Sequence, residues 1–459
     1  MYTIIKYFLT IAMLSLAILP CQSQKQSEKT ILPAEVVEEI EKRISKGITP
    51  SMAIAWIDST GTYFFNFGKT KEDGMEVDEN TIYEIGSISK VFTAILLAQQ
   101  VVDGKLALND QINDLLPDGI EVPVMGDKEI TLGSLSDHTS GLPGMPANFS
   151  PANPNNPYAD YSLNQLYEAI STYSVTREVG SEYEYSNLGM GLLGHLLAKK
   201  QNTSYEELVI QTIAKPLGMD DTRIELSETM KENLALGHLG GQIVDNWDIP
   251  TLAGAGAIRS STADMAKFIA ANLAYVNTDL RDAMTLSHQI RHDKAGGMSV
   301  AMAWHVKKGE EGDVIWHNGG TGGYKSFAGF VKETGKGVVI LTNSTQGSDD
   351  IGFHLLDPGF EMAEQNPNPN VVEVADSILS SYVGVYELQP GFNISISKEA
   401  KQLFAQATGQ DRFEIFPESD TLFFLKAIKA KISFQVNQGD VQSLTLIQRG
   451  QEMPGKKIE

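Results

Sequence analysis

The spacing of apolar residues divides the chain into a mixed region of helices and strands and a later region of strands alone. A helix is predicted over residues 34–45, followed by two strands at 51–58 and 62–67 that a Ser-Thr-Gly turn joins. Helices fill the middle of the chain, and strands return beyond Gly296. Those later strands are predicted at 298–306, 313–316, 324–331 and 338–342. Strands at both ends of a helical middle predict one sheet, assembled from the two ends of a domain that finishes near Leu356.

Polar residues and glycines mark where the predicted helices begin and end. The run 91–98 is apolar nearly all round, which predicts a helix buried inside a large domain, and Gly104 is its expected end. Ser204 with Glu207 forms a capping box that begins another helix, and Ser261 begins a third. Further helices are predicted at 110–116, at 163–173 and from Asn187 onward.

A second, smaller unit is predicted at the carboxyl end. Residues 357–375 form the expected linker, within which 364–370 are rich in proline and asparagine. Short strands at close intervals then predict a small all-β domain over 376–459, either a barrel or a sandwich. These strands are expected at 382–388, 392–397, 402–406, 413–416, 422–426, 432–436 and 444–448. The domain has no histidine, no cysteine and no catalytic constellation, so we expect it to be a lid, a spacer or a stability element.

Composition places the chain among folded, soluble proteins with two domains. It has 459 residues, of which 42% are hydrophobic and 20% are charged. The 36 basic and 58 acidic side chains give a net charge of −22, which argues against a nucleic-acid partner and for a solvated acidic surface. His288 and His292 are four residues apart but have no acidic third ligand in reach, so no metal site is expected and no cofactor is implied.

The first 23 residues are predicted to be an export signal. Lys6 precedes an apolar run over 7–19 that is too short for a membrane span. Cys21 is the only cysteine, so no disulfide and no thiolate metal site is expected. Two fates stay open: cleavage near Ser23, or lipidation of Cys21 as in bacterial lipoproteins. Either fate takes the protein out of the cytoplasm, to the periplasm or to a lipid anchor at the cell envelope, and that anchor would be its membrane contact.

The strongest candidate chemistry lies at the start of the buried helix. Ser87 and Lys90 are three residues apart, which on a helix puts the hydroxyl and the amine on one face. Burial and the helix dipole both disfavour an ammonium there, so Lys90 is expected to be a neutral base beside a serine nucleophile. Ser395 and Lys398 repeat the spacing on a predicted strand, where residues three apart point to opposite faces. That second copy is expected to be structural.

Tyr185 and Asn187 form a second candidate pair, at a predicted junction between a loop and a helix. Side chains two apart at such a junction can face one cleft. A phenol near a lysine is expected to have a depressed pKa and to shuttle protons, and Asn187 can hold a substrate amide through its carbonyl and its NH₂. Tyr275 and Asn277 repeat the form at the predicted end of a helix, where asparagine is ordinary.

The third candidate follows the strand predicted at 313–316. The residues directly after that strand are His317, Asn318, Gly319 and Gly320. Glycines there let the backbone approach a ligand closely. Backbone N–H groups on such a strand edge can form an oxyanion hole together with the N–H of Ser87.

The three motifs, in this order and at wide spacing, resemble the serine β-lactamase and penicillin-binding-protein superfamily on its class C, D,D-carboxypeptidase and family VIII esterase side. Lesser marks agree at 138–143 (His-Thr-Ser-Gly-Leu-Pro), 216–219 (Pro-Leu-Gly-Met) and 253–256 (Ala-Gly-Ala-Gly). The resemblance implies an α+β domain over 35–356, an α/β sandwich in which an antiparallel sheet lies beside a helical region. The carboxyl-terminal unit is similar to the lipocalin-like β-domains that follow this module in some relatives.

The resemblance also implies a role for each matched residue. Ser87 would be the acylated nucleophile, and Lys90 and Tyr185 would share the proton transfers. Asn187 would bind the substrate amide. The backbone amides of Ser87 and Gly320 would hold the oxyanion, and water would clear the acyl-serine.

Two departures from the class C pattern bear on the substrate. Residues 317–319 are His-Asn-Gly where those enzymes usually have Lys-Thr-Gly. The resemblance implies that these three residues bind the substrate and that His317 helps to orient the substrate and Tyr185. A histidine is largely neutral at pH 7, so its pull on a substrate carboxylate is expected to be weaker. Met145 also falls about where those enzymes tend to have a glutamine that helps bind the acyl side chain. Both changes argue against efficient β-lactam turnover.

The leading hypothesis is an exported serine hydrolase that cleaves an amide or ester of a small molecule or peptide: a β-lactam, a D-amino-acid peptide or a small ester. One alternative is a penicillin-binding sensor that acylates slowly and never turns over. Another is a structural member that uses the fold alone. The sequence leaves the substrate and the oligomeric state open.

Overall fold

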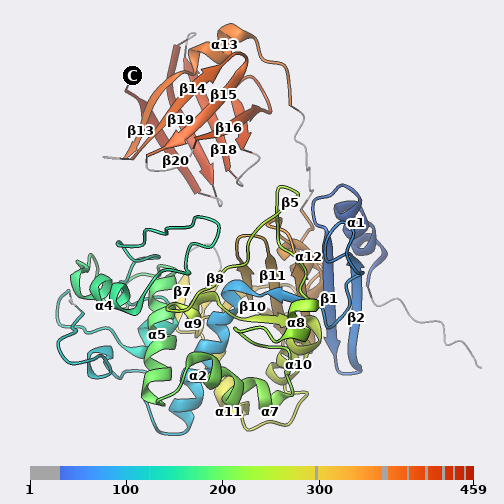
Figure 1. Ribbon diagram of the computed structural model, residues 1–459, viewed down its shortest axis with the longest axis vertical. Helices are drawn as coiled ribbons and strands as arrows, with labels where there is room; N and C mark the ends of the chain where they lie inside the picture. The colour runs from blue at the N-terminus through green and yellow to red at the C-terminus, as the bar shows by residue number, and fades with distance from the viewer. Residues whose placement is uncertain are drawn as a thin grey trace, which may run out of the picture.

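An eight-stranded antiparallel sheet forms the centre of the larger domain (Figure 1). Its strand order is β2-β1-β12-β11-β10-β9-β8-β7, so the hairpin of β1 and β2 from the start of the domain pairs through β1 with β12 from its end. The strands are β1 (Ser51–Asp58), β2 (Gly61–Gly68), β7 (His292–Lys294), β8 (Met298–Val300), β9 (His305–Lys308), β10 (Asp313–Gly320), β11 (Lys325–Val331) and β12 (Lys336–Thr342). The predicted α+β class, with one sheet built from both ends of the domain, is confirmed.

The structure is a computed structural model, and it describes residues 32–122, 125–294, 298–363, 371–389, 392–408, 412–425, 430–437, 440–448 and 451–458. The export signal predicted over 1–23, with Cys21, lies outside these ranges. The proline-rich part of the predicted linker, 364–370, also lies outside them.

Successive residues of the central strands face opposite layers of helices, as the period of a strand requires. Ala53 and Ala55 belong to the core shared with α2 and α10, whereas Met52 and Ile54 belong to the core shared with α1 and α12. The central strands β1, β11 and β12 are therefore buried on both faces, which explains their nearly continuous apolar sequences.

The helices are α1 (Ala34–Ser45), α2 (Ser89–Val102), α3 (Leu132–Ser136), α4 (Leu163–Thr172), α5 (Asn187–Lys200), α6 (Tyr205–Val209), α7 (Lys215–Leu217), α8 (Glu228–Glu232), α9 (Ala253–Gly256), α10 (Thr262–Asn272), α11 (Arg281–Ser287), α12 (Asp349–Leu356) and α13 (Asp376–Ser381). Serines begin several of them as expected: the side chains of Ser186, Ser204 and Ser261 accept backbone N–H groups at the starts of α5, α6 and α10. The predicted buried helix is α2, which a 3₁₀ turn over Gly86–Ile88 precedes.

Two elements predicted from the pattern are broken in the structure. The helix expected over 110–116 is only a 3₁₀ turn at Ile112–Asp114. The Ile112 N–H bonds to the Ile130 carbonyl, which ties this turn to the segment before α3. The strand expected over 298–306 divides into β8 and β9. Between them Ala303 has φ +60° and donates its N–H to Ser136, so the chain turns there.

The smaller domain is a closed eight-stranded barrel, with α13 packed on its core. Its strands are β13 (Gly384–Gln389), β14 (Phe392–Glu399), β15 (Gln402–Ala407), β16 (Arg412–Pro417), β17 (Leu422–Leu425), β18 (Ala430–Asn437), β19 (Asp440–Gln448) and β20 (Gln451–Lys457). The sequence analysis missed β20, because Pro454 and Gly455 are unusual inside a strand. Buried aromatic side chains fill the core, among them Tyr382 stacked on Phe434 at 4.0 Å between ring centroids.

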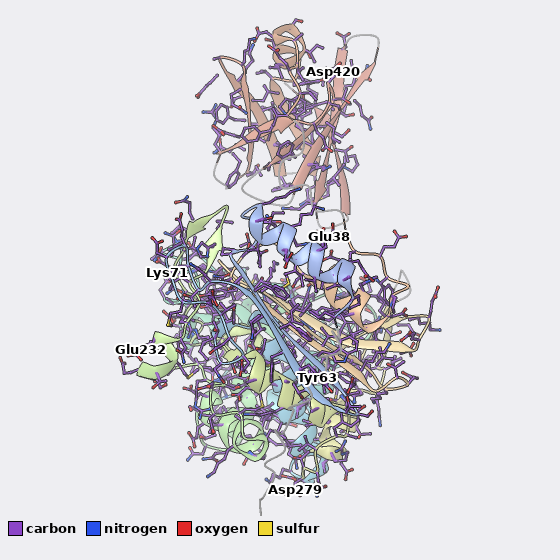
Figure 2. The ribbon with its side chains drawn as sticks, turned by 90° about the vertical axis from the view of Figure 1, so that its right-hand side faces the viewer. Glu38, Tyr63, Lys71, Glu232, Asp279 and Asp420 are labelled. Atoms are coloured by element: carbon purple, nitrogen blue, oxygen red, sulfur yellow. The ribbon has the colours of Figure 1, made fainter. Side chains whose placement is uncertain are left out.

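Many acidic side chains lie on the outside of the molecule, as the net charge predicts. Figure 2 shows Glu38, Glu232, Asp279 and Asp420 among the exposed ones, the last of them on the barrel. Within the described ranges, no helix combines the length and the apolar character that crossing a membrane requires.

A buried arginine joins α1 to α12 and gives a test of the fold. Arg43 is fully buried, and its guanidinium donates to both carboxylate oxygens of Asp350, at 3.1 and 2.5 Å, and to Glu39. Arg43→Leu leaves the Asp350 carboxylate without its cation, so we expect it to lower the free energy of unfolding by about 3 kcal/mol. Lys42→Leu removes an ion pair whose lysine side chain is 41% exposed, and should lower the free energy of unfolding by less than about 1 kcal/mol. Equal shifts of the two variants in thermal unfolding would contradict this account.

Candidate active site

The nucleophile candidate and the lysine meet at the start of α2. Lys90 is fully buried, and its Nζ lies 3.0 Å from Ser87 Oγ. The same nitrogen lies 2.7 Å from Asn187 Oδ1 and 2.7 Å from the Ala255 carbonyl oxygen. The structure therefore brings three sequence candidates together. It adds the carbonyl of Ala255, whose segment the sequence analysis noted only as a lesser family mark.

The protonation state of Lys90 determines which of its three neighbours can accept a hydrogen bond from Nζ and which can donate one to it. Burial lowers the pKa of Lys90 well below its ordinary value, which favours the neutral amine. A neutral amine has two N–H groups and one lone pair. The two carbonyl oxygens, of Asn187 and Ala255, can accept the two N–H groups, so the lone pair is left for the hydroxyl proton of Ser87.

Tyr185 also lies against this pair, but not in the protonation state expected from the sequence. Its hydroxyl forms a hydrogen bond with Ser87, and Lys90 Nζ lies 4.6 Å from the centroid of its ring. Burial raises the pKa of the Tyr185 phenol far above its ordinary value, and the Ser87 hydrogen bond only partly opposes this. The expected depression of this pKa is therefore wrong. A neutral lysine supplies no positive charge to stabilise a phenolate.

The end of β10 approaches the nucleophile turn at glycines. Gly86 has φ +50°, and a Cβ on it would lie 2.6 Å from the Gly320 nitrogen. A Cβ on Gly319 would lie only 2.0 Å from the Ile85 carbonyl oxygen. This close approach puts the backbone of Gly320 beside the turn that carries Ser87, which is the arrangement that two N–H groups need to share one oxyanion.

The histidine and the asparagine of β10 point in different directions. His317 is buried, with its ring centroid 6.2 Å from that of Tyr185, and burial lowers its pKa well below the ordinary value. It is therefore neutral, and its Nδ1 lies 2.5 Å from the Asn318 carbonyl oxygen, so that Nδ1–H donates. The Asn318 side chain lies on the other face of the sheet, where its amide donates to Asp349 at 2.5 Å. The structure thus does not bring the Asn318 side chain to the site.

Two further histidines surround the tyrosine. His138 has φ +61°, and its Nδ1 accepts the N–H of Ser186 at 3.1 Å, beside Tyr185. Its ring lies 4.7 Å from that of Tyr185, and the His305 ring lies 4.9 Å from that of His317. The sequence analysis noted His138 only as a lesser family mark and missed His305, which no local motif singles out. In the described part of the chain, no group of His, Cys, Asp and Glu is arranged to hold a metal ion.

The second Ser-x-x-Lys copy lies on β14, as expected. Lys398 forms an ion pair with Asp376 at 2.6 Å and donates to Ser380 at 2.7 Å. Ser395 and Lys398 are three apart on a strand, so their side chains leave it on opposite faces.

The fold and this site define a class: serine hydrolases built on the β-lactamase fold. The family described as Beta-lactamase matches residues 37–356, and the chain belongs to that family. A second family, described only as a domain of unknown function, matches residues 368–457.

Two relatives match most of the chain at 26% and 28% sequence identity. Penicillin-binding protein 4* of Bacillus subtilis (strain 168) is 26% identical over 424 residues, which cover 85% of this chain and 91% of that protein. The D-alanyl-D-alanine-carboxypeptidase/endopeptidase AmpH of Escherichia coli (strain K12) is 28% identical over 311 residues, 64% of this chain and 79% of that protein.

Solved structures share the fold. The octameric penicillin-binding protein homologue from Pyrococcus abyssi matches with a TM-score of 0.64 at 20% identity, over 92% of this chain and 99% of that one. The beta-lactamase/D-alanine carboxypeptidase from Pseudomonas syringae matches with a TM-score of 0.62 at 22% identity, over 70% of this chain and 97% of that one.

The approach of β10 to the nucleophile turn can be tested with one methyl group. In Gly319→Ala the new Cβ would meet the Ile85 carbonyl and Ser326 Oγ, 2.0 and 2.3 Å away, so the strand end must move off the turn. We expect the rate at which a fluorophosphonate labels the protein to fall by about a hundredfold. Gly347→Ala is the matched control, because its Cβ would meet no atom within 4 Å. A labelling rate in Gly319→Ala equal to that of the control would contradict the account.

Proposed function

We propose that this chain is an exported serine hydrolase that cleaves an amide or an ester through an acyl-serine at Ser87. One observation carries the proposal: the buried Lys90 Nζ lies 3.0 Å from Ser87 Oγ and 2.7 Å from the carbonyl oxygens of Asn187 and Ala255. Burial lowers the pKa of this amine, which favours the neutral form with its lone pair directed at the Ser87 hydroxyl. Among the described residues no carboxylate is paired with Lys90. A buried lysine without a counter-ion costs stability, so a structural role alone gives no reason for it.

The reaction begins with the Ser87 proton. Lys90 Nζ takes this proton as Oγ attacks the substrate carbonyl carbon, and the N–H groups of Ser87 and Gly320 receive the oxyanion. The neutral Tyr185 phenol donates its proton to the leaving oxygen or nitrogen and is reprotonated from Lys90. The bond to the leaving group then breaks and the acyl-serine remains. Water attacks the ester of Ser87 by the reverse proton route and frees the acid.

The candidate substrates are those that the relatives' names mention and, in addition, simple esters. Those names include beta-lactamases and D-alanyl-D-alanine carboxypeptidases. A neutral His317 offers no full charge to a substrate carboxylate, so substrates without that carboxylate are less disadvantaged here than in enzymes with a lysine at this place. We therefore place small esters and amides beside β-lactams and D-peptides as candidates. The export signal over 1–23 and the open choice between cleavage and a lipid anchor at Cys21 complete the proposal.

Covalent labelling with a fluorophosphonate tests the nucleophile. We expect one label per chain, lost in Ser87→Ala and kept in Ser395→Ala, which removes the serine of the second Ser-x-x-Lys copy. A label that persists in Ser87→Ala would remove Ser87 as the nucleophile. Steady-state rates with nitrocefin, p-nitrophenyl esters and D-Ala-D-Ala peptides then separate a hydrolase, which turns over, from a sensor, which gives a burst and stops.

A further inference from the structure

A sulfur atom and three aromatic rings border the site beside Asn187. Met145 Sδ lies 3.5 Å from Asn187 Nδ2 and accepts a hydrogen bond from the Tyr158 hydroxyl at 3.6 Å. The Tyr158 ring packs against Phe149 and Trp247, with centroid distances of 5.0 and 5.4 Å. We call these four side chains, Met145, Phe149, Tyr158 and Trp247, the apolar rim.

The apolar rim extends from one side of the reacting groups to the other. At one end, Met145 contacts the same Asn187 amide whose oxygen accepts from Lys90. At the other end, the Trp247 indole lies against Gly322, where a Cβ would be 2.6 Å from Nε1. Gly322 follows β10 by two residues, so this end adjoins the strand edge that carries the Gly320 N–H.

The rim is partly exposed although its rings pack on the core. All four side chains are intermediate in burial, and the three rings contact the main hydrophobic core. Large apolar groups left partly open beside a reactive serine are typical of a surface that binds a ligand.

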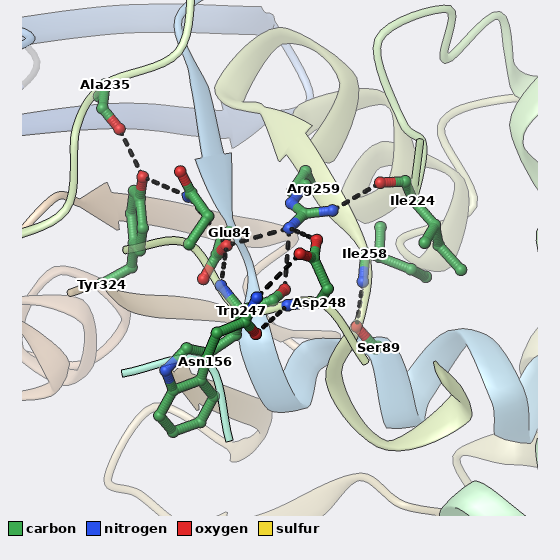
Figure 3. Close-up of polar contacts among 11 residues, drawn as sticks. Glu84, Ser89, Asn156, Ile224, Ala235, Trp247, Asp248, Ile258, Arg259 and Tyr324 are labelled. Atoms are coloured by element: carbon green, nitrogen blue, oxygen red, sulfur yellow. Dashed lines mark hydrogen bonds and ion pairs between the residues drawn. The ribbon is translucent and has the colours of Figure 1, made fainter. Parts of the chain in front are cut away.

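A buried ion pair fixes the position of Trp247 (Figure 3). Its backbone N–H donates to Glu84 Oε1 at 2.9 Å, and its carbonyl oxygen accepts from Arg259 Nη2 at 2.8 Å. Glu84 and Arg259 are 3% and 6% exposed and lie 3.3 Å apart. Both main-chain groups of Trp247 are thus held by buried charges, and its indole packs against the Tyr158 ring and Gly322.

The loop that carries Tyr158 is tied to the same segment. The Asn156 side chain accepts the N–H of Asp248 at 2.8 Å and donates to the Asp248 carboxylate at 2.9 Å. Thr251 donates to the Tyr161 carbonyl at 2.5 Å. The two segments that supply the rings of the rim are therefore joined on both sides of Tyr158, and the rim is preformed.

The chemistry of the rim favours apolar groups over amides. A thioether is a weak acceptor and donates nothing, and the Tyr158 hydroxyl already directs its proton at the sulfur. An amide placed there would lose its hydrogen bonds to water without full replacement, whereas an alkyl or aryl chain would lose none.

Building on the proposed function, we propose that the apolar rim receives the acyl part of the substrate, and that Met145 is a specificity-determining residue for apolar acyl groups over acyl groups that carry an amide. The substrate class is thus an ester or amide of an alkyl or aryl carboxylic acid.

Matched p-nitrophenyl esters test this inference. We compare kcat/KM for the hexanoate with kcat/KM for the N-acetylglycinate, which has a similar length but carries an amide. The wild-type ratio should favour the hexanoate by roughly tenfold or more. Met145→Gln supplies an amide that can bond to the acetylglycinate, so the ratio should fall by about tenfold. Met145→Leu stays apolar and should keep the ratio, whatever its effect on either rate.

Two further variants separate the rim from the catalytic groups. Met75→Gln is the matched control, because Met75 is 58% exposed, and it should leave both rates unchanged. Trp247→Ala should raise KM for the hexanoate by several-fold and change KM for the acetate ester little, because a two-carbon acyl group is too short to use the rim.

Fluorophosphonate labelling distinguishes failure of this inference from failure of the proposed function. If Ser87 is not labelled in the wild type, the proposed function fails. If Ser87 is labelled in the wild type and in Met145→Gln but the ester ratio is the same in both, or if the wild type prefers the acetylglycinate, the inference about the rim is overturned while the function stands.

Discussion

An amine that is buried and must stay uncharged is the constraint on which the rest of this site depends. Lys90 lies inside the domain, where no carboxylate in the described part of the chain pairs with it, and burial lowers its pKa. A charged amine would prefer water, and the surroundings would have to open to admit it. The helix and the loops around Lys90 therefore have a chemical role. They exclude water from the amine, which keeps its pKa low and allows it to act as a base.

The position of that base explains why parts of the chain far apart in sequence have to meet. Asn187 at the start of α5 and Ala255 in α9 take the two N–H groups of Lys90, which leaves only Ser87 for the lone pair. The end of β10 then completes the site from the sheet side, at a distance that only a glycine at 319 permits. The same segment after α8 that holds Trp247 is anchored by Glu84, three residues before Ser87, so the rim and the nucleophile share one support.

The features of the site that depend on local spacing could be predicted from the sequence, and those that depend on tertiary contacts could not. The Ser87 and Lys90 pair was predictable because i, i+3 spacing on an apolar helix fixes its own geometry. The phenol pKa of Tyr185 was mispredicted, because its sign depends on whether the nearby lysine is charged, which only tertiary burial decides. The contact of Met145 with Asn187 and the placing of His305 arise from segments far apart in sequence, and the outward direction of Asn318 follows from strand alternation once β10 is known to extend through Gly320.

The most direct test of the account is the protonation state of Lys90, read from the ¹³Cε resonance of selectively labelled lysine as pH is varied, with the signal assigned by its loss in Lys90→Gln. Because burial lowers the pKa of this amine, we predict that the signal has the shift of a neutral amine at pH 7 and moves to that of an ammonium only as the pH falls through the lowered value. A Lys90 signal that stays charged at pH 7 and titrates with the exposed lysines, at about pH 10.4, would contradict the central claim.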